Sequence, residues 1–136
     1  MSLDPVQALK AVTGALADSS TCGKSHESAL AILGSLLYHQ ECWNLMLRAG
    51  VLEECVALLR RPACTVICQE RAVGLLYILA MTTKEMRTAI RHAGGLEPLH
   101  RLSSSGSGKV KDSARAAMEI FAKRGELNDG PDDATE

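Results

Sequence analysis

Residues 48–59 read Arg-Ala-Gly-Val-Leu-Glu-Glu-Cys-Val-Ala-Leu-Leu, and residues 92–102 read His-Ala-Gly-Gly-Leu-Glu-Pro-Leu-His-Arg-Leu. Each copy has a basic residue, then Ala-Gly, then an apolar run rich in leucine. The copies begin at Arg48 and His92, 44 residues apart. Repetition with a period of about 40–47 residues is typical of helical repeat proteins. The sequence therefore predicts a chain built from repeated helical units.

Helical periodicity extends over most of the chain on both sides of these two stretches. Apolar residues recur three or four positions apart, and alternating runs of β-branched residues are absent. Asp4 before Pro5 is a good helix start, and Thr83 can cap the helix that follows it. We therefore expect an all-α protein with about eight helices, at residues 5–17, 25–38, 42–48, 51–60, 65–81, 84–92, 96–102 and 109–123. Polar loops are expected at residues 18–23 and 103–108.

The three longest apolar helices align with one another. Each has an acid, an alanine two residues later, and two large apolar residues at the same internal spacing: Glu27, Ala29, Leu33 and Leu36; Glu70, Ala72, Leu76 and Leu79; Asp112, Ala114, Met118 and Phe121. The small alanine lets neighbouring helices approach closely, and the large residues fill the space between layers. Units of this kind bury a continuous core only when they stack.

The same patterns predict which side chains lie inside. In the helix at 65–81 we expect the core residues to be Ile67, Ala72, Val73, Leu75, Leu76 and Leu79, and in the last helix Val110, Ala114, Ala117, Met118 and Phe121. The basic residues Arg60, Arg61, Arg87, Arg91, His92, His100 and Arg101 are expected on solvated faces.

The Ala-Gly junctions at Ala49-Gly50 and Ala93-Gly94, followed by the segments 69–80 and 112–122 within the long helices, resemble the armadillo repeat family. The resemblance covers roughly residues 5–124 and implies a right-handed α-solenoid, an armadillo- or HEAT-like superhelix. The short first helix and the Ala-Gly junction favour armadillo over HEAT.

In family terms the chain divides into a tail at 1–4, a repeat domain at 5–124 and a disordered acidic tail at 125–136. The domain contains a partial unit at 5–39 and repeats at 41–82 and 84–124. Three units are close to the minimum for a stable stack. Either the ends are capped or the chain is a segment of a longer array.

The resemblance also implies a binding surface. In armadillo proteins the long helices line a concave groove that receives an extended peptide or a partner helix. Receptors for basic import peptides carry Trp and Asn ladders there. This chain instead has Ala31, Gly74 and Ala116 at the Trp-like positions and Ser35, Ile78 and Ile120 at the Asn-like positions. The import-receptor function is therefore disfavoured.

What remains is a candidate groove with a small, apolar floor. Its expected residues are Glu27, Ala31, Ser35, Tyr38, Glu70, Gly74, Ile78, Met81, Asp112, Ala116 and Ile120. Gly74 either permits close helix packing or leaves room for a partner. A shallow apolar floor suits an amphipathic helix better than a basic peptide. The acids Glu27, Glu70 and Asp112 either complement helix dipoles or form a weak rim for a basic partner.

Motifs for catalysis and cofactors are missing from the sequence. Cys64 and Cys68, and Cys22 and His26, are four residues apart but do not form paired zinc knuckles. No nucleophile elbow occurs, and Gly106-Ser107-Gly108-Lys109 lacks the first glycine of a phosphate loop. We therefore expect no metal, no cofactor and no enzymatic activity.

Charge balance and cysteine content indicate which compartment and which class of partner to expect. Residues 1–124 hold fifteen Lys and Arg against eleven Asp and Glu, a balance of +4, while the last twelve residues hold five acids and no base. A dense basic stripe with aromatic residues is absent, so nucleic acid is not expected. No apolar stretch is long enough to span a membrane. Five cysteines without a secretory signal favour reduced thiols and a cytoplasmic, or nuclear, location.

These observations favour a non-catalytic protein-interaction module acting as a scaffold, adaptor or co-chaperone. Two alternatives remain open. The chain could be a regulatory or substrate-binding segment of a larger enzyme such as a ubiquitin ligase. It could also self-associate, because an open stack would leave apolar ends at Val6 and Leu9 or at Met118 and Phe121.

Overall fold

The computed structural model describes residues 4–17, 23–61 and 64–124. Within these residues the chain forms eight α-helices and no strand, so the prediction of an all-α protein is confirmed. The expected tails at 1–4 and 125–136 fall almost wholly outside this part of the chain, as does most of the loop at 18–23. The helices are α1 (Pro5–Ala17), α2 (Lys24–Leu36), α3 (Glu41–Ala49), α4 (Val51–Arg60), α5 (Val66–Ala80), α6 (Lys84–His92), α7 (Leu96–Ser105) and α8 (Gly108–Lys123).

Local capping sets several of these boundaries. The Thr83 hydroxyl accepts a hydrogen bond from the Met86 N–H at 3.1 Å, as the sequence predicted. Thr65 caps α5 in the same way, accepting from the Cys68 N–H at 3.1 Å, so α5 begins one residue later than expected. Helices α1, α4 and α6 begin and end at the predicted residues.

The expected loop at 103–108 is mostly helical, which corrects the prediction. Helix α7 continues three residues beyond Leu102, and α8 already begins at Gly108. The hydroxyls of Ser103 and Ser105 donate to backbone carbonyls of the preceding turn, at 2.6 and 2.9 Å. This back-bonding satisfies the hydroxyls inside a helix, although a serine run usually signals a loop.

Each Ala-Gly junction contains a glycine with a positive φ. Gly50 has φ 78° between α3 and α4, and Gly94 has φ 81° between α6 and α7. This left-handed region is strained for residues with a side chain, and it commonly ends a helix. The need for one left-handed residue in each junction therefore explains the repeated glycine, although one residue separates the first pair of helices and three separate the second.

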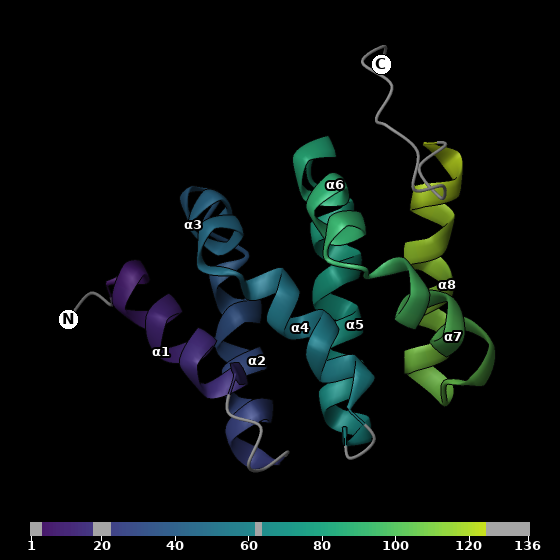
Figure 1. Ribbon diagram of the computed structural model, residues 1–136, viewed down its shortest axis with the longest axis horizontal. Helices are drawn as coiled ribbons and strands as arrows, with labels where there is room; N and C mark the ends of the chain where they lie inside the picture. Colours follow the sequence, from purple (N-terminus) through teal and green to yellow (C-terminus); the bar gives the residue numbers. More distant parts are fainter. Residues whose placement is uncertain (1–3, 18–22, 62–63, 125–136) are drawn as a thin grey trace.

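Helix α5 lies between α2 and α8 and packs against both (Figure 1). All three run in the same direction across the molecule, while α1 packs on α2 and α7 packs on α8. Helix α4 faces α5 and also contacts α1, α6 and α7. The helices that hold the candidate groove are thus neighbours on one side of α4.

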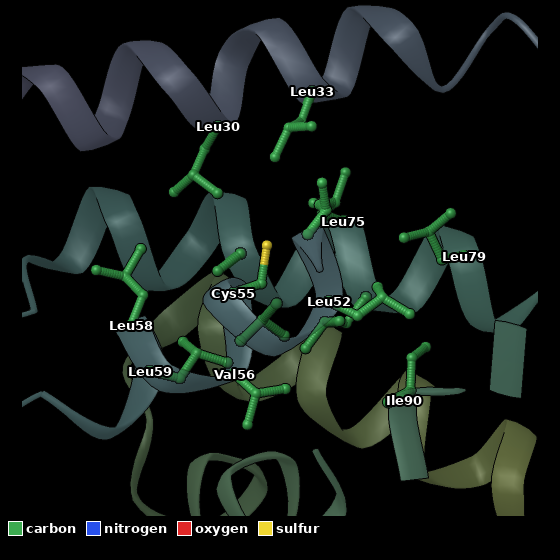
Figure 2. Packing of buried hydrophobic residues seen from close by; sticks show 14 of the residues in the cluster. Leu30, Leu33, Leu52, Cys55, Val56, Leu58, Leu59, Leu75, Leu79 and Ile90 are labelled. Atoms are coloured by element: carbon green, nitrogen blue, oxygen red, sulfur yellow. The ribbon is translucent and has the colours of Figure 1, made fainter. Parts of the chain in front are cut away.

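The buried apolar residues form one cluster that extends from Leu9 in α1 to Phe121 in α8. Figure 2 shows its middle, where α4 residues such as Leu52 and Cys55 meet side chains from α2, α5 and α6. Fully burying one such aliphatic side chain contributes about 1.5–3 kcal/mol to folding. The cluster therefore ties the first and last helices into one folded body.

The aligned alanines are buried as predicted: Ala29, Ala72 and Ala114 are at most 2% exposed. Ile67 is a correction, because its side chain is 45% exposed. The buried stripe of α5 runs through Cys68, Ala72 and Leu79, and Ile67 lies one residue off it.

The predicted apolar ends also need correction. Leu9 and Phe121 are 2% and 0% exposed, and Met118 is partly buried against the core. The Val6 side chain lies outside the described residues. Leu9, Met118 and Phe121 therefore do not supply the exposed apolar ends that were predicted, while self-association itself stays a prediction.

Several arginines that were expected on solvated faces instead donate hydrogen bonds to backbone carbonyls at the ends of helices. Arg87 is 4% exposed and donates to the Ala80 carbonyl at 3.0 Å. Arg61 donates to the Leu16 carbonyl at 3.1 Å, and Arg101 donates to the Leu59 carbonyl at 2.8 Å. Arg91 is also buried, at 6% exposure. The last carbonyls of a helix lack partners within it. Arg61, Arg87 and Arg101 donate to such carbonyls from positions 7 to 45 residues later in the chain.

No helix in the described part of the chain is long and apolar enough to cross a membrane.

Candidate functional site

A cleft of about 450 Å³ lies between α2 and α5. It brings together five of the predicted groove residues, Ala31, Tyr38, Glu70, Gly74 and Ile78. The rest of its lining is Leu30, Gly34, Leu37, Arg71 and Leu75. The predicted residues Glu27 and Ser35 lie on α2, and Met81 lies just beyond α5, but none of these three lines the cleft.

Two glycines, one from each helix, line the cleft. Gly34 and Gly74 lie inside α2 and α5, and neither has a positive φ. A Cβ atom added at either glycine would meet nothing within 4 Å. Close helix packing therefore does not explain the glycine at position 74. The backbone of Gly74 faces the cleft with no side chain covering it. Glycine in a helix interior destabilises by about 1 kcal/mol relative to alanine.

Gly34 lines the cleft but is not one of the predicted groove residues. Those residues follow from repeat columns, and the column of Gly34 holds Tyr77 in the next unit and Glu119 in the last. The signal that identified Gly74, a glycine in the middle of a helical pattern, was also present at Gly34.

Charged groups lie at the end of the cleft near the start of α2. Glu70 and Arg71 line it, and the Arg71 Nη1 donates to the Glu27 carbonyl at 2.7 Å. This bond fastens α5 to the first turn of α2 and fixes the register between the helices. The Glu27 carboxylate itself lies in the first turn of α2, where the helix dipole favours a negative charge.

Large apolar groups are exposed at the other end. Tyr38 is 91% exposed, Met81 is 53% exposed and Ile78 is 43% exposed. The Ser35 hydroxyl is satisfied within its own helix, donating to the Ala31 carbonyl at 3.4 Å. Exposed apolar groups gathered around a cleft are typical of interaction sites. The cleft is therefore charged at one end and apolar at the other.

The α8 residues predicted for the groove do not line this cleft. Asp112 is exposed, while Ala116 and Ile120 are half-buried on α8, which packs on the opposite side of α5 from α2. The predicted acidic row Glu27, Glu70 and Asp112 is accordingly spread over three helices, and only Glu70 lines the cleft.

The cysteines of the described residues are buried thiols. Cys42, Cys55, Cys64 and Cys68 form no disulfide, and no three or more His, Cys, Asp or Glu side chains in this part of the chain are placed to hold a metal ion. Burial raises the pKa of the Cys55 thiol to about 12, and the Glu54 carboxylate adds to the rise. Cys22, the partner of His26 in the sequence spacing, lies outside the described residues.

A comparison with protein-family models and a search of curated proteins both return no match. The geometry of the cleft is therefore the basis for assigning a function.

Proposed function

We propose that this chain is a non-catalytic protein-interaction module, a scaffold, adaptor or co-chaperone, that binds its partner in the cleft between α2 and α5. We also propose that its helices form a short right-handed α-solenoid of the armadillo type. The positive φ of glycine in both junctions, at Gly50 and Gly94, and the aligned buried alanines support that arrangement.

The observation that carries the proposal is the pair of open glycines. Gly34 and Gly74 each leave space that no neighbouring atom fills. Alanine at either position would fit and would favour the helix by about 1 kcal/mol. Glycine at both positions leaves open space at the cleft, which a partner can use and which folding does not require.

An amphipathic helix fits this cleft better than an extended peptide. The lining is mostly aliphatic, with charges confined to Glu70 and Arg71. Extended peptides gain affinity from ladders of main-chain hydrogen bonds, whereas a helix lays an apolar face into a groove. The partner helix would place a large apolar side chain over the glycines and polar groups toward Arg71.

The chemistry of the lining also favours binding over catalysis. It contains one carboxylate and one guanidinium, and no histidine, cysteine or serine. A nucleophile paired with a base is therefore not present in the cleft. The free thiols fit a reducing compartment, cytoplasm or nucleus.

The proposal is tested by filling the cleft with charge. Gly74→Arg combined with Ile78→Arg places two guanidinium groups over the apolar floor. Gly14→Arg is the matched control, because Gly14 is exposed on α1 and a Cβ there meets nothing within 4 Å. Circular dichroism and thermal unfolding confirm that each variant folds.

Partners captured from cells by the wild-type chain should be lost from the cleft variant and retained by Gly14→Arg. If the folded cleft variant keeps every partner, the cleft is not the binding site.

A further inference from the structure

Helix α6 has a row of positively charged residues along one side. Lys84, Arg87, Thr88 and Arg91 follow the spacing i, i+3, i+4 and i+7, so they share one face of the helix, and we name them the basic stripe. The residues of α6 that pack with the core lie on the opposite side: Met86, Ala89 and Ile90.

The basic stripe is covered although it faces away from this side of the helix. Arg87 is 4% exposed and Arg91 is 6% exposed, while Lys84 and Thr88 are half-buried. A charged side chain on an outward helix face ordinarily stays in water, because burial costs free energy unless opposite charges and hydrogen bonds compensate for it. A covering segment rich in carboxylates would supply that compensation.

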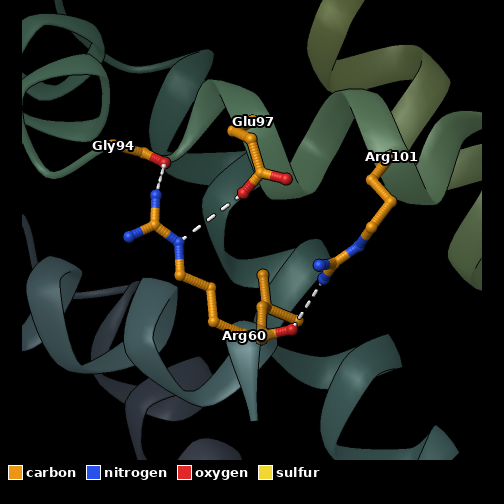
Figure 3. Close-up of polar contacts among 5 residues, drawn as sticks. Arg60, Gly94, Glu97 and Arg101 are labelled. Atoms are coloured by element: carbon orange, nitrogen blue, oxygen red, sulfur yellow. Dashed lines mark hydrogen bonds and ion pairs between the residues drawn. The ribbon is translucent and has the colours of Figure 1, made fainter. Parts of the chain in front are cut away.

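Arg60 shows how an arginine of this chain serves a backbone carbonyl and a carboxylate together. Its Nη2 donates to the Gly94 carbonyl at 2.9 Å, while its Nε lies 3.6 Å from the Glu97 carboxylate (Figure 3). Arg87 has the first half of this arrangement, because its Nη1 donates to the Ala80 carbonyl at 3.0 Å. A guanidinium carries five N–H donors, so that bond is compatible with a second bond to a carboxylate.

The last turn of α8 lies at the same end of the molecule as the basic stripe. The Arg87–Ala80 bond places the stripe beside the last turn of α5. Helix α8 packs on α5 and runs in the same direction, so both helices end near α6 (Figure 1). Packed helices are about 8–10 Å apart. The chain that follows Arg124 therefore leaves α8 about one helix spacing from the end of α5.

Residues 125–136 have the charge and the length to reach the stripe. They contain no base and five acids: Glu126, Asp129, Asp132, Asp133 and Glu136. No other stretch outside the described residues contains more than one acid. Twelve extended residues span up to about 40 Å, whereas α6, with nine residues, is about 14 Å long. The segment can therefore cross the end of α5 and follow the stripe along its whole length.

We infer that the acidic segment 125–136 binds along the basic stripe of α6 in the same molecule. Its carboxylates pair with Lys84, Arg87 and Arg91 and offset the cost of holding these charges out of water. The short connection through α8 gives the segment an effective concentration on the order of millimolar at the stripe, which favours the same molecule over a second copy. The bound segment connects the last helix to α6.

The first test is carbodiimide cross-linking of the whole chain at low concentration, with mass spectrometry of the digested peptides. Carbodiimide joins a lysine amine to a carboxylate when the two are in contact, so we expect Lys84 to be joined to acids of 125–136. Lys109 and Lys111 are internal controls, because they are tethered to the same segment but lie about 20 Å from the end of α8. Equal yields at Lys84 and at these two lysines would overturn the inference.

Isotope labelling separates contacts within one molecule from contacts between copies. Labelled and unlabelled chains are mixed before cross-linking, and we expect the Lys84 products to join peptides of the same isotope class. Products that join the two classes as often as chance allows would assign the segment to a second copy and would contradict binding within one molecule.

Hydrogen exchange of the whole chain tests whether the carboxylates are responsible. Asp129→Asn, Asp132→Asn and Asp133→Asn together remove three charges from the segment. We expect the backbone amides of α6 to exchange about fivefold faster in this variant, because the ion pairs that hold the segment on the helix are lost. Unchanged exchange in α6 would refute the inference.

The matched control removes the same charge elsewhere. Glu41→Gln, Glu53→Gln and Glu119→Gln replace exposed acids on α3, α4 and α8, and together they should leave exchange in α6 unchanged. Thermal unfolding shows whether each variant is folded. Equal acceleration in both triple variants would indicate a general charge effect and would count against the segment. The basic stripe shares no residue with the lining of the cleft, so a failure here leaves the proposed function intact.

Discussion

Replacing the cleft glycines with alanine should stabilise the protein. Gly74 lies in the middle of α5 and Gly34 in the last turn of α2; neither has a positive φ, and a Cβ at either position meets no atom within 4 Å. The substitution therefore gains helix propensity and restricts the unfolded chain without creating a clash. Most substitutions destabilise, so a gain in stability at a proposed binding site is a discriminating result.

The expected magnitude follows from the helix propensity scale. Gly→Ala in a helix interior is worth about 0.8–1.0 kcal/mol, with the unfolded-state effect contained within that figure. For a domain of this size, 1 kcal/mol corresponds to a rise in Tm of about 3–6 °C. Partner binding should fall in the same variants, because each methyl group fills part of the cleft.

The assay is urea and thermal denaturation of Gly34→Ala, Gly74→Ala and two controls. Gly14→Ala, in an open helix position on α1, should stabilise equally and leave partner binding unchanged. Gly95→Ala should destabilise by about 1–3 kcal/mol, because its Cβ would lie 2.9 Å from the Ile90 carbonyl oxygen. If Gly74→Ala lowers the free energy of unfolding, the glycine is structural and the argument for an open cleft is wrong.

Two further predictions concern capping and a buried thiol. Thr83→Ala should lower the free energy of unfolding by about 1 kcal/mol, because the Met86 N–H loses its 3.1 Å partner; an unchanged urea midpoint would contradict it. The Cys55 pKa is raised from 9.0 to about 12 in the folded protein, so the unfolded chain loses this proton first as pH rises. Stability should therefore fall between pH 9 and 12, by up to about 1.4 kcal/mol per pH unit. Cys55→Ala should show a shallower slope in urea unfolding over the same range, and equal slopes would refute the assignment.

Features that depend on nearby residues were predictable from the sequence. The caps, the helical periodicity and the Ala-Gly junctions are local, and they located all eight described helices. The prediction was wrong at α7, where two serine hydroxyls bond to the preceding turn. A serine run gives the same sequence signal in a loop and in a back-bonded helix.

Features that depend on distant residues were less predictable. Arg61 and Arg101 reach carbonyls 45 and 42 residues earlier in the chain, and charge patterning gives no indication of which carbonyl is within reach. The predicted groove stays a prediction. Repeat columns pointed to Asp112 and Ala116 on α8, and neither residue lines the cleft between α2 and α5, which holds five of the predicted residues.

The arginine bonds to helix ends limit how the chain can be shortened. A truncation after Thr82 falls between helices and leaves α1 to α5 intact as sequence. It nevertheless removes Arg87 and Arg101, and with them the donors to the Ala80 and Leu59 carbonyls. A fragment cut at this boundary between sequence repeats therefore has carbonyls without their arginine donors at two helix ends. A minimal stable fragment would need replacement donors at both places.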